Sequence, residues 1–121
     1  TRELAYACAN NGFLIIDNGV MTEHYGDKQP VGIYGHEIKP FTAHEMTLKE
    51  NVTLYSYTDG YPDQFGGEKG KKFKSKTLNQ LLVANSHLQL HDQKDKLLEE
   101  FIAWKGNHEQ IDDVCVMGIK F

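Results

Sequence analysis

Residues 52–67 read VTLYSYTDGYPDQFGG, and this stretch decides the fold. Its first part, residues 52–58, is rich in β-branched and aromatic residues, which favour a strand. Asp59-Gly60 follows with turn residues that end the strand. The stretch therefore places one carboxylate, that of Asp59, at the end of a strand, where a charge is costly unless it is solvated, hydrogen-bonded or neutralised by a cation.

The chain before this strand predicts further strands. Larger residues alternate with alanines over residues 4–9, an apolar run covers residues 13–16, and a third extended segment covers residues 20–25. Asn10-Asn11-Gly12 and Asn18-Gly19 supply turns, so these segments predict an antiparallel meander. Residues 26–40 contain too many glycines and prolines for a helix. Residues 41–48 predict another strand. Residues 49–51 predict a turn that connects it to the strand at residues 52–58.

The chain after residue 76 predicts two helices and one strand. Between them and the strand at residues 52–58, residues 61–76 predict a loop rich in glycine and lysine. Thr77 and Gln80 have the spacing of a capping box, and Asp92 predicts the cap of a second helix, which ends at Gly106. Apolar residues share one face of each helix: Leu78, Leu81 and Leu82 in the first, and Leu97, Leu98, Phe101 and Ile102 in the second. With a last strand over residues 114–121, we expect an α+β fold in which two antiparallel helices pack on one face of an antiparallel sheet.

Composition narrows the class of protein. The 121 residues fit one domain, and 40% hydrophobic with 25% charged residues is typical of a globular protein. Thirteen Lys and Arg against 17 Asp and Glu give a formal charge of −4, which argues against a nucleic-acid partner. No apolar run approaches the roughly 20 residues that a membrane span needs. Cys8 and Cys115 lie in apolar stretches and predict buried thiols rather than a disulfide, which favours a cytoplasmic location.

Two acidic sites lie where strands meet loops. Asp59 ends one strand, and Asp112-Asp113 precedes the last strand. If those strands are neighbours, the two sites could hold an oxygen-preferring ion such as Mg²⁺ or Mn²⁺. The alternative is a simple turn at Asp59-Gly60 and a solvated strand start at Asp112-Asp113.

The lysine-rich loop also has two interpretations. Five lysines gather there and could attract a phosphorylated protein, or they could simply be solvated: Lys69, Lys71, Lys72, Lys74 and Lys76. The glycines of this loop do not have the spacing of a nucleotide-binding P-loop. Trp104 near the end of the second helix is expected to pack rather than to recognise a ligand.

Several segments, in chain order, resemble the metal-dependent protein serine/threonine phosphatases (PPM superfamily) in their bacterial SpoIIE-like branch. The main ones are LYSYTDGYPDQFGG at residues 54–67, GKKF at residues 70–73 and QIDDV at residues 110–114. Asn10-Asn11 and Pro30-Val31-Gly32-Ile33 are also similar to that branch. The resemblance covers essentially the whole chain and implies a PPM-type β-sandwich.

The resemblance implies a two-metal hydrolase of phosphoserine and phosphothreonine, in which a water activated by Mn²⁺ or Mg²⁺ is the nucleophile and no side chain is. Asp59 and Asp112 then correspond to metal ligands, and Asp113 points away by strand alternation. Gly60 is expected to leave room for the ion and its waters, and Lys71 and Lys72 to contact the phosphorylated substrate. The parent protein is expected to be the output domain of a bacterial signalling protein, with an upstream sensor domain in the same chain.

One departure from the family limits this expectation. The family has an Asp followed by glycine in its N-terminal half, which bridges the metals, whereas Asp-Gly occurs here only at Asp59-Gly60. We therefore expect residues 1–121 to be the C-terminal part of the catalytic domain, with Thr1 marking a cut through it. Such a fragment would hold metal weakly, be inactive alone and pair with a second copy through its open sheet edges. The alternative is a non-catalytic interaction or regulatory module on a phosphatase-like half-fold.

Overall fold

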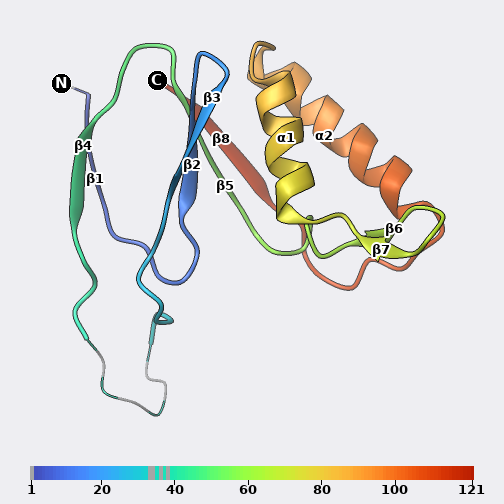
Figure 1. Cartoon of the computed structure of the whole chain (residues 1–121), viewed down its shortest axis with the longest axis horizontal. Coiled ribbons are helices and arrows are strands. Elements are labelled where there is room, and N and C mark those ends of the chain that lie inside the picture. Colours follow the sequence, from blue (N-terminus) through green and yellow to red (C-terminus); the bar gives the residue numbers. More distant parts are fainter. Residues whose placement is uncertain (1, 33–34, 36, 38) are drawn as a thin grey trace.

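The computed structural model describes residues 2–32, 35, 37 and 39–121; Thr1, and Ile33 of the segment at residues 30–33, lie outside this range. The elements in chain order are β1 (Glu3–Tyr6), β2 (Phe13–Asp17), β3 (Val20–His24), β4 (His44–Thr47), β5 (Thr53–Tyr57), β6 (Phe65–Gly66), β7 (Lys71–Lys72), α1 (Ser75–Asn85), α2 (Leu90–Lys105) and β8 (Val116–Lys120). Figure 1 shows α1 and α2 on one side of the sheet that contains β2 and β5, with β1 and β4 on the other side. The predicted α+β class, with antiparallel sheets and two helices that run in opposite directions on one face, is confirmed.

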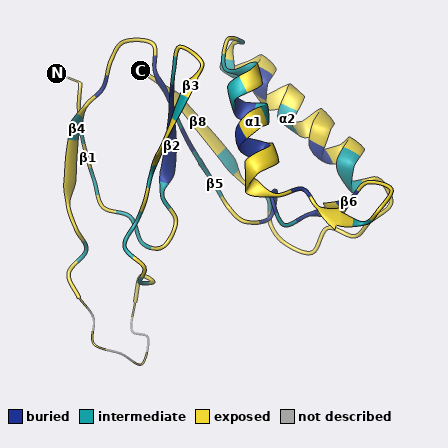
Figure 2. Ribbon diagram, in the orientation of Figure 1, coloured by how far each residue is buried: buried dark blue, intermediate teal, exposed yellow. Residues whose placement is uncertain are grey.

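The central sheet has four strands in the order β3-β2-β5-β8, and every neighbouring pair is antiparallel. Side chains alternate across β2, so that Leu14 and Ile16 join the cluster under the helices while Phe13 and Ile15 join the cluster under β1 and β4. Figure 2 accordingly shows most of β2 as buried. This strand is apolar on both faces because each face of the sheet is covered.

The predicted meander is only half right. β2 and β3 form a hairpin, with Asn18 and Gly19 at positive φ in its turn. β1 pairs instead with β4, in a separate two-stranded sheet. The turn expected at Asn10-Asn11-Gly12 is part of a longer crossing between layers, where the backbone N–H of Asn10 donates to the carbonyl oxygen of Asp27 at 2.7 Å.

The helix termini differ from the sequence-based expectation. α1 begins at Ser75 after Lys74, which has φ 79° and makes no capping bond with its side chain, so the expected capping box at Thr77 is wrong. α2 begins at Leu90, and Asp92 lies in its first turn rather than at its cap. The C-terminus is as predicted, because Gly106 has φ 50° and its N–H donates to the carbonyl oxygen of Ile102 at 3.0 Å.

Burial also corrects two expectations. The stripe predicted for α2 is only partly covered, since Phe101 is 7% exposed whereas Leu98 and Ile102 are 56% and 57% exposed. Cys8 is half-buried and Cys115 is exposed, so neither is the deeply buried thiol that the apolar flanks predicted, although both are free. No helix among the described residues is both long and apolar enough to cross a membrane.

The loop expected over residues 61–76 contains a short hairpin. Its strands, β6 and β7, pair Phe65 with Lys72 and Gly66 with Lys71. The hairpin lies against the end of α2, where the N–H of Gly67 donates to the carbonyl oxygen of Trp104 at 2.9 Å. A side chain on Gly66 would approach that same oxygen to 2.0 Å, so only glycine allows this contact. Because the hairpin depends on this packing against α2, which is distant in the sequence, the local sequence predicted only a loop.

Candidate functional site

The two predicted acidic sites lie at the same end of the central sheet. β5 and β8 are hydrogen-bonded neighbours, so the residue after β5 and the residues before β8 are adjacent. Thr58 joins them: its N–H donates to the carbonyl oxygen of Cys115 at 3.0 Å, and its Oγ1 accepts from the N–H of Cys115 at 3.1 Å and donates to the carbonyl oxygen of Asp113 at 3.2 Å. The structure therefore brings Asp59 next to the segment that carries Asp112.

Gly60 allows the closest approach between these segments. A Cβ atom at this position would lie 2.0 Å from the carbonyl oxygen of Asp113 and 3.3 Å from a methyl carbon of Val114. We expected the missing side chain to leave room for an ion, but the space that it would fill is occupied by the backbone of Asp113. Glycine at position 60 is thus required for the contact between the two acidic segments.

The carboxylate of Asp112 is oriented locally. Its Oδ1 accepts a hydrogen bond from the N–H of Asp113 at 2.8 Å, and its carbonyl oxygen accepts one from Nε2 of Gln110 at 3.0 Å. Both Asp112 and Asp59 are exposed, so neither carboxylate carries the desolvation cost of a buried group.

Oxygen donors of this kind suit hard divalent cations. Asp59 and Asp112 offer carboxylate oxygens, which match the preference of Mg²⁺ and Mn²⁺. Among the described residues, however, no three acidic, histidine or cysteine side chains gather closely enough to hold a metal ion. The chain fits such an ion through two carboxylates only, and the rest of the shell has to come from water, substrate or other protein oxygens.

A cleft of about 260 Å³ extends from Asp59 toward the start of α1. Its polar lining is connected: the hydroxyl of Tyr57 donates to Oδ1 of Asn79 at 2.9 Å, and Nδ2 of Asn79 donates to Oε1 of Glu23 at 3.2 Å. Burial raises the pKa of Tyr57, and the charges of Glu23 and Asp59 raise it further, so Tyr57 stays a neutral donor. The wall of the cleft beside Asp59 is therefore a connected polar network.

The predicted substrate lysines lie on the β6–β7 hairpin, and both are exposed. Nζ of Lys72 forms an ion pair with Oδ1 of Asp63 at 3.3 Å and lies 5.9 Å from the centre of the Phe65 ring. The N–H of Asp63 in turn donates to the carbonyl oxygen of Asp59 at 2.9 Å. Lys72 is thus linked to Asp59 through Asp63 and the turn that joins Asp59 to Asp63. Half of the Lys72 side chain remains exposed to solvent. Lys71 lies on the same short strand.

Sequence reasoning missed Gln64 and Asn79, which are buried polar residues at the centre of two hydrogen-bond networks. Gln64 was visible within the Asp-Gln-Phe-Gly-Gly segment, but its role depends on residues more than 40 positions away. The position of Tyr57 could have been predicted, because residues two apart in a strand share a face. Tyr57 therefore lies on the same side of β5 as Tyr55, the side that faces the helices. Trp104 was correctly expected to pack, and its indole ring lies edge-on to Phe73 with ring centres 5.5 Å apart.

Comparisons with known proteins agree with this architecture. The family described as Stage II sporulation protein E (SpoIIE) matches residues 1–121. Among solved structures, the chain is similar to the SiaA-PP2C domain of Pseudomonas aeruginosa, with a TM-score of 0.86 and 28% identity over 99% of this chain and 46% of that one. It also matches the SpoIIE PP2C phosphatase domain with a fragment of the regulatory domain from Bacillus subtilis, with a TM-score of 0.67 and 17% identity over 98% of this chain and 33% of that one.

A Bacillus subtilis SpoIIE phosphatase domain described as Mn presoaked matches with a TM-score of 0.54 and 16% identity, over 92% of this chain and 46% of that one. No match was found among the curated proteins. The chain therefore spans less than half of the length of each of these three structures.

Proposed function

Since the chain belongs to the SpoIIE family, we propose that it forms the C-terminal part of a Mn²⁺- or Mg²⁺-dependent protein serine/threonine phosphatase domain. The observation that carries the proposal is the junction of β5 and β8, where Thr58 and Gly60 hold Asp59 beside the segment of Asp112. A strand-end carboxylate next to a second one, both exposed and both oxygen donors, suits a divalent cation.

In this proposal each residue of the junction has a distinct role. Asp59 and Asp112 hold the cations, which when bound activate the phosphate and the attacking water as Lewis acids. Gly60 and Thr58 position the two carboxylates. The cleft lined by Tyr57 and Asn79 receives the polypeptide on which the phosphate sits, and Lys71 and Lys72 attract the charged substrate from the neighbouring hairpin.

The partners follow from the same reaction. The substrate is a phosphorylated signalling protein, and an upstream sensor domain in the same parent chain controls the domain. We place the reaction in the cytoplasm, a reducing compartment in which the free thiols of Cys8 and Cys115 persist. One of the similar structures, the SpoIIE phosphatase domain of Bacillus subtilis, includes a fragment of a regulatory domain, which is consistent with the link to a sensor domain.

The test uses the full-length protein with Mn²⁺ and a phosphoserine protein of the anti-sigma-antagonist type. Asp59→Asn and Asp112→Asn should each reduce phosphate release by more than about a hundredfold, because losing even the hydrogen-bonding partner of a metal ligand costs about 10- to 100-fold. Asp95→Asn, which changes an exposed carboxylate on α2, is the matched control and should keep full activity. An inactive parent, or an active Asp59→Asn variant, contradicts the proposal.

A non-catalytic interaction module is the second candidate. The observation in its favour is that the described residues supply two carboxylates rather than a complete set of metal ligands. Calorimetry separates the two candidates: Mn²⁺ uptake by the full-length protein that is weakened in Asp112→Asn supports the phosphatase, whereas tight binding of a partner protein without metal uptake supports the module. In either case we expect the isolated chain to release no phosphate.

A further inference from the structure

We propose that Gln64 is a positioning residue for Asp112, an inference that rests on the proposed function of Asp112 as a metal ligand. Gln64 lies in the loop before β6 and is only 1% exposed. Its Nε2 donates to the carbonyl oxygens of Phe65 and Glu109, each at 2.9 Å. The second of these bonds fixes the backbone three residues before Asp112.

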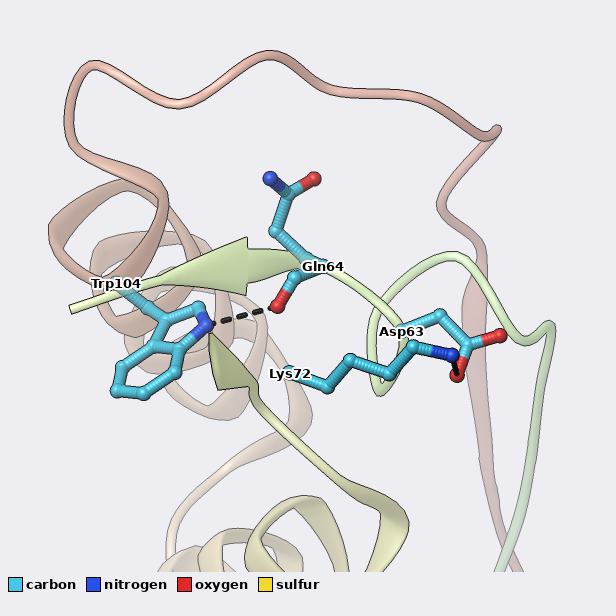
Figure 3. Close-up of polar contacts among 4 residues, drawn as sticks. All are labelled: Asp63, Gln64, Lys72 and Trp104. Carbon is cyan, nitrogen blue, oxygen red and sulfur yellow. Dashed lines mark hydrogen bonds and ion pairs between the residues drawn. The ribbon is translucent and has the colours of Figure 1, made fainter. Parts of the chain in front are cut away.

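The main chain of Gln64 is held as firmly as its side chain. Its carbonyl oxygen accepts hydrogen bonds from the indole N–H of Trp104 at 2.9 Å, drawn in Figure 3, and from the N–H of Phe73 at 3.0 Å. Its own N–H donates to the carbonyl oxygen of Tyr61 at 3.2 Å. The hairpin and the end of α2 therefore fix the backbone of Gln64, from which its side-chain amide reaches Glu109.

The segment that receives this bond needs such an anchor. Residues 106–115 connect α2 to β8, and all of them except Val114 are exposed. Two long-range side-chain bonds bracket Asp112: Gln64 to the carbonyl oxygen of Glu109 on one side, and Thr58 to the carbonyl oxygen of Asp113 on the other. Without the first bond, the segment before Asp112 loses its long-range anchor, and the position of the Asp112 carboxylate relative to Asp59 is less well fixed.

The side chain of Gln64 is not optimised for stability alone. Its Oε1 is buried and accepts no hydrogen bond from any described residue, which is unfavourable for a carbonyl oxygen. An apolar side chain of the same length, such as methionine, would remove that unpaired acceptor. The donor Nε2, in contrast, has two partners. What glutamine provides and methionine does not is thus the hydrogen bond to Glu109, which holds the segment of Asp112 in place.

The experiment measures Mn²⁺ affinity of the full-length protein by calorimetry, together with amide hydrogen exchange over residues 109–113. Gln64→Met removes both donors at nearly constant length, and we expect it to weaken Mn²⁺ binding about tenfold, at the lower end of the cost of losing a partner of a metal ligand. Tyr61→Phe is the matched control, because it removes one hydrogen bond of a buried side chain, to the carbonyl oxygen of Leu97, without touching residues 109–113. This control should bind Mn²⁺ within about twofold of the parent.

A double variant shows whether Gln64 acts through Asp112. In an Asp112→Asn background, Gln64→Met should cause no further loss of Mn²⁺ affinity. Equal losses in Gln64→Met and Tyr61→Phe, or unchanged affinity and exchange in Gln64→Met, overturn the positioning role while Asp112 remains a ligand. Unchanged affinity in Asp112→Asn alone overturns the proposed metal site and this role together. If Gln64→Met does not fold, Gln64→Leu, which also removes the donors and buries no charge, takes its place with the same expected outcome.

Discussion

Gly60 lies so close to Asp113 that a Cβ atom on residue 60 would be only 2.0 Å from the carbonyl oxygen of Asp113. The atom in the way belongs to backbone, so a side chain at position 60 has to push the two strand ends apart. The approach of Asp59 to the Asp112 segment therefore depends on a single glycine.

Gly60→Ala is expected to destabilise the protein by about 1–3 kcal/mol, the usual cost of forcing an extra carbon into a packed site. It should also weaken Mn²⁺ binding. Gly118→Ala is the matched control on β8, because a Cβ atom there meets only side-chain atoms of Leu90 and Tyr55 at 3.3 Å or more. Urea unfolding of both variants checks the prediction, and equal midpoints for the two would contradict it.

Thr58→Val is expected to lower the free energy of unfolding by about 0.5–1.5 kcal/mol, because the exposed N–H of Cys115 and carbonyl oxygen of Asp113 lose their shared partner and bond to water instead. The shape of the side chain is conserved, so packing is preserved. Thr22→Val on β3 is the control, since the exposed hydroxyl of Thr22 makes no hydrogen bond among the described residues. Thermal unfolding of both variants is the measurement, and a Thr58→Val protein as stable as the control would show that the junction is held by other contacts.

Alkaline pH is expected to destabilise the protein through its buried tyrosines. Burial raises the pKa of Tyr55, Tyr57 and Tyr61 above the ordinary value of about 10. The folded state therefore holds these protons more tightly than the unfolded state, so stability is complete below about pH 10 and falls as the pH rises further.

Tyr61→Phe separates the two contributions of that hydroxyl. At pH 7 the variant should be less stable by about 1 kcal/mol, because the hydrogen bond to the carbonyl oxygen of Leu97 at 2.7 Å is lost. Above pH 10 its stability should fall less steeply than that of the parent, since one titrating group is gone. Urea unfolding between pH 7 and pH 11 measures both effects, and parallel curves for the two proteins would refute the second.

Local sequence predicted the parts of the fold that depend on neighbours in the chain. The apolar run of β2 and the turn at Asn18-Gly19 gave the β2–β3 hairpin, and Gly106 gave the end of α2. The partner of β1 was not predictable in this way, because alternation indicates a strand but not the strand it pairs with. The hairpin β6–β7 was missed for a related reason, since its two-residue strands depend on Trp104.

The candidate site was likewise predictable only in part. The sequence placed Asp59 and Asp112 where strands meet loops, but only the structure shows that the two strands, β5 and β8, are neighbours. The role of Gln64 could not be predicted, since the glutamine and Glu109 are 45 residues apart and are brought together by packing of the hairpin on α2. Nor could the exposure of Leu98 and Ile102, because a helical stripe shows which residues share a face but not how wide a surface covers it.

The isolated chain is expected to self-associate through the open side of α2 and β8. A groove of about 430 Å³ with a largely apolar lining runs between these elements, and the exposed Leu98 lines it next to Val116. β8 pairs only with β5 among the described strands, so its outer edge has free backbone groups beside the exposed side chains of Met117 and Ile119. Unpaired edges with apolar neighbours favour association.

Leu98→Lys combined with Ile119→Lys should convert the dimer to a monomer, because each places a charge where apolar surface would be buried. Val20→Lys is the control, since Val20 is 67% exposed on β3, at the opposite edge of the sheet. Light scattering at several protein concentrations measures the mass. A parent chain that is monomeric throughout would remove the prediction, and a dimer broken equally by Val20→Lys would move the contact to the other edge.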